Sequence, residues 1–186
     1  AGYILIPFGL ATSGAAGAVV NDAAVQAVLF YLIAYAVMNI GAFGVAIAVN
    51  RRTGLRAISD YAGLGSRSPL LAVGLSVFLL SLGGAPPTVG LWAKFAIVQA
   101  ALTEVTTFGI VLMVFLVINS VIAFFYYLKV IKTMWMDEAD AAAPVLQPGF
   151  NLSAVVVVLA AATVILGVLP GLISNATSLA GMVAAG

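Results

Sequence analysis

Lys94 is the residue in this sequence whose type and position point most directly to chemistry. It follows a run of helix-breaking residues inside a long apolar stretch, which reads SLGGAPPTVGLWAKF over residues 81–95. A charge at the centre of a bilayer costs about 2.5 to 3.5 kcal/mol on insertion scales, so such residues are expected to be functional. Burial disfavours the charged form of a lysine and a nearby carboxylate favours it, so changes of hydration or neighbouring charge can switch its protonation. Lys94 is therefore a candidate functional group inside the membrane.

The alternative interpretation of Lys94 is snorkelling, in which the stem follows apolar surface and the ammonium group reaches water. The next charged residue along the chain is Glu104. If the chain is helical, that residue lies about 15 Å further along the helix axis. Lys94 is then too deep for an easy escape, and we expect a functional side chain.

Helix-breaking residues precede Lys94 by a few turns: Gly83, Gly84, Pro86 and Pro87. Glycine weakens a helix, and proline removes a backbone donor and clashes with the preceding turn. The apolar stretch over 69–102 also exceeds the roughly 20 residues that one membrane crossing needs. Unwound backbone at membrane depth must lie against protein or a hydrated cavity. We therefore expect a helix over 69–102 that is broken near 83–88.

The composition is that of a polytopic helical membrane protein. Of the 186 residues, 64% are hydrophobic and 7% are charged, and the mean hydropathy is +1.23. A soluble globular domain does not have such a composition. The sequence contains no cysteine and no histidine, which excludes disulfides, histidine-ligated haem and cysteine-held iron–sulfur clusters within it. It also contains no motif for nucleotide or nucleic-acid binding and no catalytic triad.

The apolar segments predict an all-α transmembrane bundle, with 1–186 forming a single transmembrane region. About five helices are expected from the length of the apolar runs. Their predicted ranges are 3–20, 24–49, 69–102 with its break, 107–128 and 152–169. No basic segment precedes the first helix, as it would in a signal peptide. We expect a fragment that starts part-way through a membrane helix.

The basic residues predict the orientation of the bundle. If the helices cross back and forth, the polar loops 51–68 and 129–149 share one face and hold every lysine and arginine except Lys94. The turns near Asn21 and Glu104, on the other face, hold none. By the positive-inside rule the two loops are expected to be cytoplasmic, with the C-terminus on the periplasmic side in a bacterium.

Three polar side chains recur at a spacing of four along the predicted helix 24–49: Tyr31, Tyr35 and Asn39. This spacing places them on one face. They are candidates for a polar path beside Lys94, or alternatively they bond to neighbouring helices, at about 0.6 kcal/mol each. Asn119 carries the same two interpretations. Tyr126 and Tyr127 are typical of an aromatic belt at the membrane surface.

Several stretches resemble the antiporter-like subunits of respiratory complex I, and most closely the subunit N branch of NADH-quinone oxidoreductases. Residues 81–95 resemble the signature SLxGxPPxxGFxxKF, with Leu91 where phenylalanine is usual. YLIAYAVMNIGAF at 31–43 resembles YxxxYxxMNxGAF. The remaining matches are the opening AGYIL, the loop segment DYAGLG with the following SP, and FYYLKV.

The resemblance implies an inverted-repeat fold with one broken helix in each repeat, of which this chain would be the last part. It implies that Lys94 ends the proton path of a half-channel in a proton-pumping enzyme complex. No cofactor is expected in this chain, and no redox chemistry. NADH, FMN, iron–sulfur clusters and quinone would be held by partner subunits. The expected partners are other membrane-arm subunits and the lipid bilayer, without nucleic acid, in a bacterial plasma membrane or alternatively a mitochondrial inner or thylakoid membrane.

Two other interpretations remain open. A subunit of a multisubunit cation/proton antiporter or of a membrane-bound hydrogenase relative would share the broken helix and its lysine. A structural role is the other: the region would scaffold neighbouring subunits, with Lys94 held in a fixed ion pair.

Overall fold

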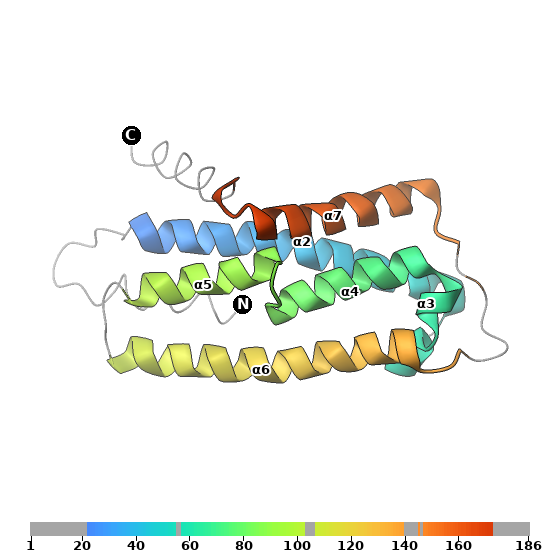
Figure 1. Ribbon diagram of the computed structural model, residues 1–186, viewed down its shortest axis with the longest axis horizontal. Helices are drawn as coiled ribbons and strands as arrows, with labels where there is room; N and C mark the ends of the chain where they lie inside the picture. The colour runs from blue at the N-terminus through green and yellow to red at the C-terminus, as the bar shows by residue number, and fades with distance from the viewer. Residues whose placement is uncertain (1–21, 55–56, 103–106, 140–144, 146, 173–186) are drawn as a thin grey trace.

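The computed structural model is an all-α bundle of long apolar helices, which confirms the predicted fold class (Figure 1). It describes residues 22–54, 57–102, 107–139, 145 and 147–172. The predicted helix 3–20 and the end of the chain lie outside these residues. The described elements are α2 (Asp22–Thr53), the 3₁₀ helix η2 (Ile58–Tyr61), α3 (Leu64–Arg67), α4 (Pro69–Gly83), α5 (Val89–Leu102), α6 (Thr107–Met136) and α7 (Phe150–Val168).

Three of these helices are long and apolar enough to cross a membrane by themselves. The spans are Val25–Arg51, Gly109–Met136 and Phe150–Val168. Helices α4 and α5 are shorter, and the 15 residues of α4 reach only about 22 Å, less than the hydrocarbon thickness of about 30 Å. Helices α4 and α5 must therefore cross the membrane together, with their junction inside it.

The broken helix lies where the helix-breaking residues are. Helix α4 begins at Pro69, a residue that suits the first helical position because its missing N–H would have no partner there. It ends at Gly83, and α5 begins at Val89. Figure 1 shows α4 and α5 one after the other between α2 and α6.

The expected end of the helix 107–128 is wrong, because α6 continues to Met136. Lys129 and Lys132 favour an earlier end, since charged residues do not belong in the hydrocarbon. The last turns of α6 instead pack against the segment that joins α2 to α4. Met134 is fully buried, and the indole N–H of Trp135 donates to the hydroxyl of Ser76 on α4 over 3.0 Å. Tertiary contacts therefore extend the helix beyond its apolar part.

Helix α2 packs along both halves of the broken helix. One buried cluster joins Phe30, Tyr31 and Met38 of α2 to the face of α5 that carries Ala93 and Ile97. A second cluster joins α2 to α4, α6 and α7 around Phe78, which is fully buried. A Cβ atom added to Gly41 of α2 would overlap the Phe78 ring, so the two helices approach closely there.

The described helices cross back and forth, as the predicted orientation assumes. The segment between α2 and α4 and the segment between α6 and α7 lie at the same end of the bundle (Figure 1). Lys132, near that end, forms a loose ion pair with Asp137 at 4.0 Å.

Candidate functional site

The site is built at the end of α4, where the chain turns at Gly84. Gly84 has φ +91, a left-handed conformation that suits glycine because it has no Cβ. Its N–H donates to the carbonyl of Ser81 over 2.9 Å, and the N–H of Ala85 donates to the carbonyl of Leu80 over 2.9 Å. These bonds form a Schellman turn, which provides partners for two of the four terminal carbonyls of α4.

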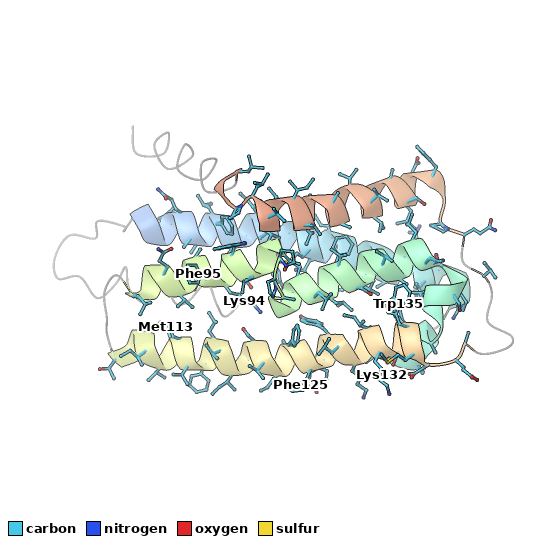
Figure 2. The ribbon with its side chains drawn as sticks, in the orientation of Figure 1. Lys94, Phe95, Met113, Phe125, Lys132 and Trp135 are labelled. Carbon is cyan, nitrogen blue, oxygen red and sulfur yellow. The ribbon has the colours of Figure 1, made fainter. Side chains whose placement is uncertain are left out.

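Lys94 provides partners for the other two. Its Nζ donates to the carbonyl oxygen of Gly83 over 2.8 Å and to that of Leu82 over 3.1 Å. Lys94 is half-buried, and Figure 2 shows it at the junction between α5 and α4. All four terminal carbonyls of α4 therefore have donors, which a helix end inside lipid requires because hydrocarbon offers none.

The surroundings of Lys94 act on its charge in opposite directions, because the carbonyl end of α4 favours the ammonium form whereas burial opposes it. The C-terminal end of a helix carries a partial negative charge, and a cation there is stabilised by about 0.3 to 1 kcal/mol, or more when partly buried. No acidic side chain among the described residues forms an ion pair with Lys94. The fixed ion pair of the structural interpretation is thus not found in this part of the chain.

The start of α5 is held by a side chain of α4. The N–H of Gly90 donates to the hydroxyl of Ser81 over 3.1 Å, and that hydroxyl donates to the sulfur of Met38 on α2 at 2.8 Å. Ser81 has no solvent exposure. A Cβ atom on Gly90 would overlap the carbonyl oxygen of Ser81, so only glycine permits this approach. The sequence indicated the segment but not Ser81, which is one of two serines in a helix that is apolar apart from them.

Helix α7 contacts the same junction from another side. The indole N–H of Trp92 on α5 donates to the carbonyl of Gly167 over 2.7 Å. A Cβ atom on Gly167 would overlap the backbone of Pro87 and Thr88. Thr88 is buried, and both its N–H and its hydroxyl donate to the carbonyl of Ala85. The end of the unwound segment at Thr88 is therefore packed against α7.

Comparison with known proteins shows the family to which this architecture belongs. Residues 8–123 match the model of the family described as NADH:quinone oxidoreductase/Mrp antiporter, transmembrane. The chain belongs to this family.

The relatives in the NADH:quinone oxidoreductase/Mrp antiporter family are longer than this chain. It is 44% identical over 150 residues to NADH-quinone oxidoreductase subunit N 2 of Roseiflexus castenholzii, covering 77% of this chain and 28% of that protein. It is 40% identical over 159 residues to subunit N 1 of Herpetosiphon aurantiacus, covering 83% of this chain and 31% of that protein. The chain thus spans less than a third of either relative. The resemblance seen in the motifs is confirmed.

Two solved structures share the fold. A chain of an archaeal membrane-bound sulfane sulfur reductase has a TM-score of 0.74 and 27% identity, with 86% of this chain and 32% of that chain covered. A chain of respiratory complex I from Thermus thermophilus with bound Aureothin has a TM-score of 0.67 and 24% identity, with 94% of this chain and 43% of that chain covered. The second likeness concerns the fold alone.

The helix-breaking residues expected from the sequence all lie in or next to the turn. Gly83 ends α4, and a Cβ atom there would lie 2.5 Å from the ring of Phe124 on α6. Gly84 makes the left-handed turn described above. Pro86 and Pro87 are exposed and joined by a cis peptide bond.

The three polar residues of α2 are placed differently from one another. Tyr31 is buried in the cluster with α5, and its ring stacks on that of Tyr35 with a centroid distance of 5.5 Å. Tyr35 is 39% exposed. The amide of Asn39 donates to the carbonyl of Tyr35 over 2.8 Å, within the same helix. Asn119 of α6 behaves in the same way and donates to the carbonyl of Phe115. The role of the three α2 residues in a polar path beside Lys94 stays a prediction.

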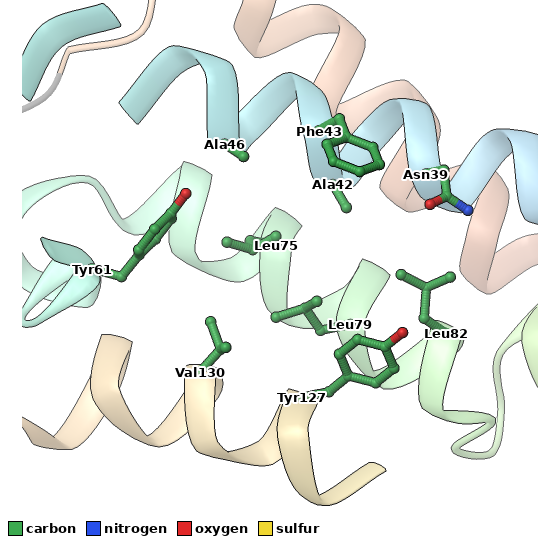
Figure 3. A pocket seen from close by; sticks show the side chains of 10 residues that line it. All are labelled: Asn39, Ala42, Phe43, Ala46, Tyr61, Leu75, Leu79, Leu82, Tyr127 and Val130. Atoms are coloured by element: carbon green, nitrogen blue, oxygen red, sulfur yellow. The ribbon is translucent and has the colours of Figure 1, made fainter. Parts of the chain in front are cut away.

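An open cleft of about 290 Å³ lies between α2, α4 and α6 (Figure 3). Its lining is mostly apolar, and its polar members are Asn39, Tyr61 and Tyr127. Tyr61 lies in η2, and burial and then the charge of Asp60 raise the pKa of its hydroxyl. The cleft also reaches Leu82, whose carbonyl accepts from Lys94. It therefore runs from the connecting segment toward the break.

Proposed function

We propose that this chain is part of a membrane-arm subunit of a proton-translocating NADH-quinone oxidoreductase, and that Lys94 carries the proton in its half-channel. The observation that carries the proposal is the contact of the Lys94 Nζ with the carbonyl oxygens of Leu82 and Gly83, at a helix break inside the membrane. Such intramembrane ionisable groups at broken helices mark ion and proton pathways. The relatives named subunit N support the choice of enzyme complex.

The geometry suits a group that gains and loses a proton. An ammonium group has three N–H donors, and two of them bond the α4 carbonyls. A neutral amine retains two N–H donors, so it can keep the same two bonds after the third proton leaves. Proton release therefore requires no rearrangement of the end of α4.

Protonation in this arrangement would respond to charge and hydration nearby. The carbonyl end of α4 favours the ammonium form, while burial opposes it. A carboxylate or a water that approaches Lys94 would shift this balance. In the proposal, electron transfer in partner subunits that hold NADH, FMN, iron–sulfur clusters and quinone supplies that change, and no redox step occurs in this chain.

The proposal places the chain in a bacterial plasma membrane. The end of the bundle with Arg51, Arg67, Lys129 and Lys132 would face the cytoplasm, in line with the positive-inside rule. Its partners would be other membrane-arm subunits and lipid.

The test is proton translocation by the assembled complex in membrane vesicles, with Lys94→Met in the full-length subunit. Lys132→Met, which removes an exposed lysine of the same bundle, is the matched control. We expect Lys94→Met to assemble and to lose proton pumping or coupled turnover, while Lys132→Met behaves as the wild type. Unchanged pumping by assembled Lys94→Met would refute the assignment.

A second candidate is a subunit of a cation/proton antiporter or of a membrane-bound hydrogenase relative, which the breadth of the matched family favours. Copurification of the native subunit distinguishes the two. Flavin and iron–sulfur subunits in the complex support the oxidoreductase, whereas their absence together with sodium-dependent proton exchange supports the antiporter.

A further inference from the structure

The two halves of the broken helix cap each other. Lys94, on α5, donates to the last two carbonyls of α4. Ser81, on α4, accepts from the N–H of Gly90 in the first turn of α5. We propose that Ser81 is a positioning residue for Lys94: its hydroxyl fixes the start of α5 against α4 and α2, and thereby holds the Lys94 Nζ at the carbonyls of Leu82 and Gly83. This inference rests on the proposed function of Lys94.

The link between the two caps is the geometry of α5. Gly90 and Lys94 are four residues apart, so they lie one above the other on the same face of the helix. The bond from Gly90 to Ser81 therefore fixes the turn from which the Lys94 stem extends. The overlap that a Cβ on Gly90 would have with the Ser81 carbonyl shows how closely this face of α5 meets α4.

The hydroxyl of Ser81 also has a fixed orientation. It donates to the Met38 sulfur at 2.8 Å and accepts from Gly90, so its hydrogen and a lone pair are both engaged. Met38 is 3% exposed and Ser81 is not exposed at all. Ser81 is on α4 and its two partners are on α2 and α5, so the hydroxyl joins all three helices at one point.

The loss of this hydroxyl would affect α5 before it affects the bundle. The Gly90 N–H is among the first four amides of α5, which have no acceptor within the helix. Hydrocarbon cannot replace the lost acceptor. The start of α5 would then shift to find another acceptor, and Lys94 would move away from the carbonyls of Leu82 and Gly83. Its charge would remain, and the helices would still pack through their buried clusters.

The experiment uses the assembled complex with Ser81→Ala or Ser81→Thr in the full-length subunit. Ser76→Ala is the matched control, because Ser76 is also on α4 and its hydroxyl also bonds another helix, accepting from Trp135. Lys94→Met is measured in parallel. The readouts are assembly, NADH-to-quinone electron transfer, protons pumped per electron, and the pH profile of coupled turnover.

We expect assembled Ser81→Ala to transfer electrons but to pump at least about twofold fewer protons per electron, with a displaced pH profile, because proton transfer needs groups within hydrogen-bond reach. Ser81→Thr, which restores a hydroxyl, should recover most of the ratio, and Ser76→Ala should match the wild type. If Ser81→Ala does not assemble, Ser81→Cys replaces it under the same criteria, since a thiol keeps the volume and bonds weakly.

The inference would be overturned if Ser81→Ala kept the wild-type number of protons pumped per electron and the wild-type pH profile. It would also be overturned if assembled Ser81→Thr pumped no better than Ser81→Ala, or if Ser76→Ala lost as much pumping as Ser81→Ala. The parallel measurement of Lys94→Met separates the positioning role of Ser81 from the proposed function of Lys94. Loss of pumping in Lys94→Met with normal Ser81→Ala rejects only the positioning role, whereas normal pumping in Lys94→Met rejects the proposed function itself.

Discussion

The Nζ of Lys94 lies 2.8 Å from the carbonyl oxygen of Gly83, so a side chain of α5 provides the donor that the end of α4 lacks. The same lysine is therefore both a structural cap and a titratable group inside the membrane. Because a neutral amine can keep both bonds to α4, the cap does not force the lysine to remain charged. A break stabilised in this way can contain a proton carrier without coming apart when the proton leaves.

Gly84→Ala should impair pumping as well as stability. A residue with a Cβ atom at φ +91 costs about 1 to 2 kcal/mol of stability. The new Cβ would also lie 3.3 Å from the Lys94 Nζ and 3.4 Å from its Cδ. Gly54→Ala is the control, because Gly54 has φ +70 and open space around it. Both variants should lower the midpoint of thermal inactivation of the complex, and only Gly84→Ala should lower protons pumped per electron. If Gly84→Ala and Gly54→Ala pumped equal numbers of protons per electron, the predicted effect of the new Cβ on Lys94 would be contradicted.

Gly41→Ala should destabilise the complex by about 1 to 3 kcal/mol, the range for overpacking a filled core. A Cβ at Gly41 would overlap the Phe78 ring, which is fully buried. Gly44 lies three residues further along α2 with nothing within 4 Å, so Gly44→Ala should be neutral or slightly stabilising. Thermal inactivation of the two variants measures the difference. A tolerated Gly41→Ala would mean that α2 and α4 are too far apart for this overlap.

Trp92→Phe should weaken the packing of α5 on α7 without changing pumping. It removes the bond to the Gly167 carbonyl, and such bonds between membrane helices contribute about 0.6 kcal/mol on average and up to about 1.7. Trp135→Phe, which removes the bond to Ser76, should have a similar effect on the inactivation midpoint. If assembled Trp92→Phe lost pumping, the contacts of α5 with α4 would not be enough to place Lys94, and the bond to α7 would be needed as well.

The break could be predicted from the sequence because its cause is local. Two consecutive prolines, Pro86 and Pro87, strongly disfavour a continuous helix in any fold, and the apolar stretch around them is too long for one crossing. Lys94 stands out in the sequence because a charge within apolar sequence is expensive for any fold. These features depend on residue type and on distance along the chain.

Features that depend on which partner a side chain meets in the folded bundle could not be predicted in this way. A spacing of four fixes the face of Asn39 but not its partner, which is the carbonyl of Tyr35 in its own helix. The predicted end of α6 is wrong because Lys129 and Lys132 mark only the end of the apolar part, whereas the helix continues to Met136 and buries Met134 on the way. The importance of Ser81 depends on Gly90 and Met38 lying within hydrogen-bond distance of its hydroxyl.

Lys94→Arg distinguishes a lysine that changes protonation from one that only supplies a charge. Arginine keeps the positive charge and can donate to the same carbonyls, but it is not deprotonated in proteins. The measurement is protons pumped per electron by the assembled complex, with Lys94→Met beside it. We predict that Lys94→Arg loses pumping as fully as Lys94→Met does while the complex remains assembled. Pumping by Lys94→Arg at the wild-type ratio would show that a fixed charge suffices, and Lys94 would then not be the proton carrier.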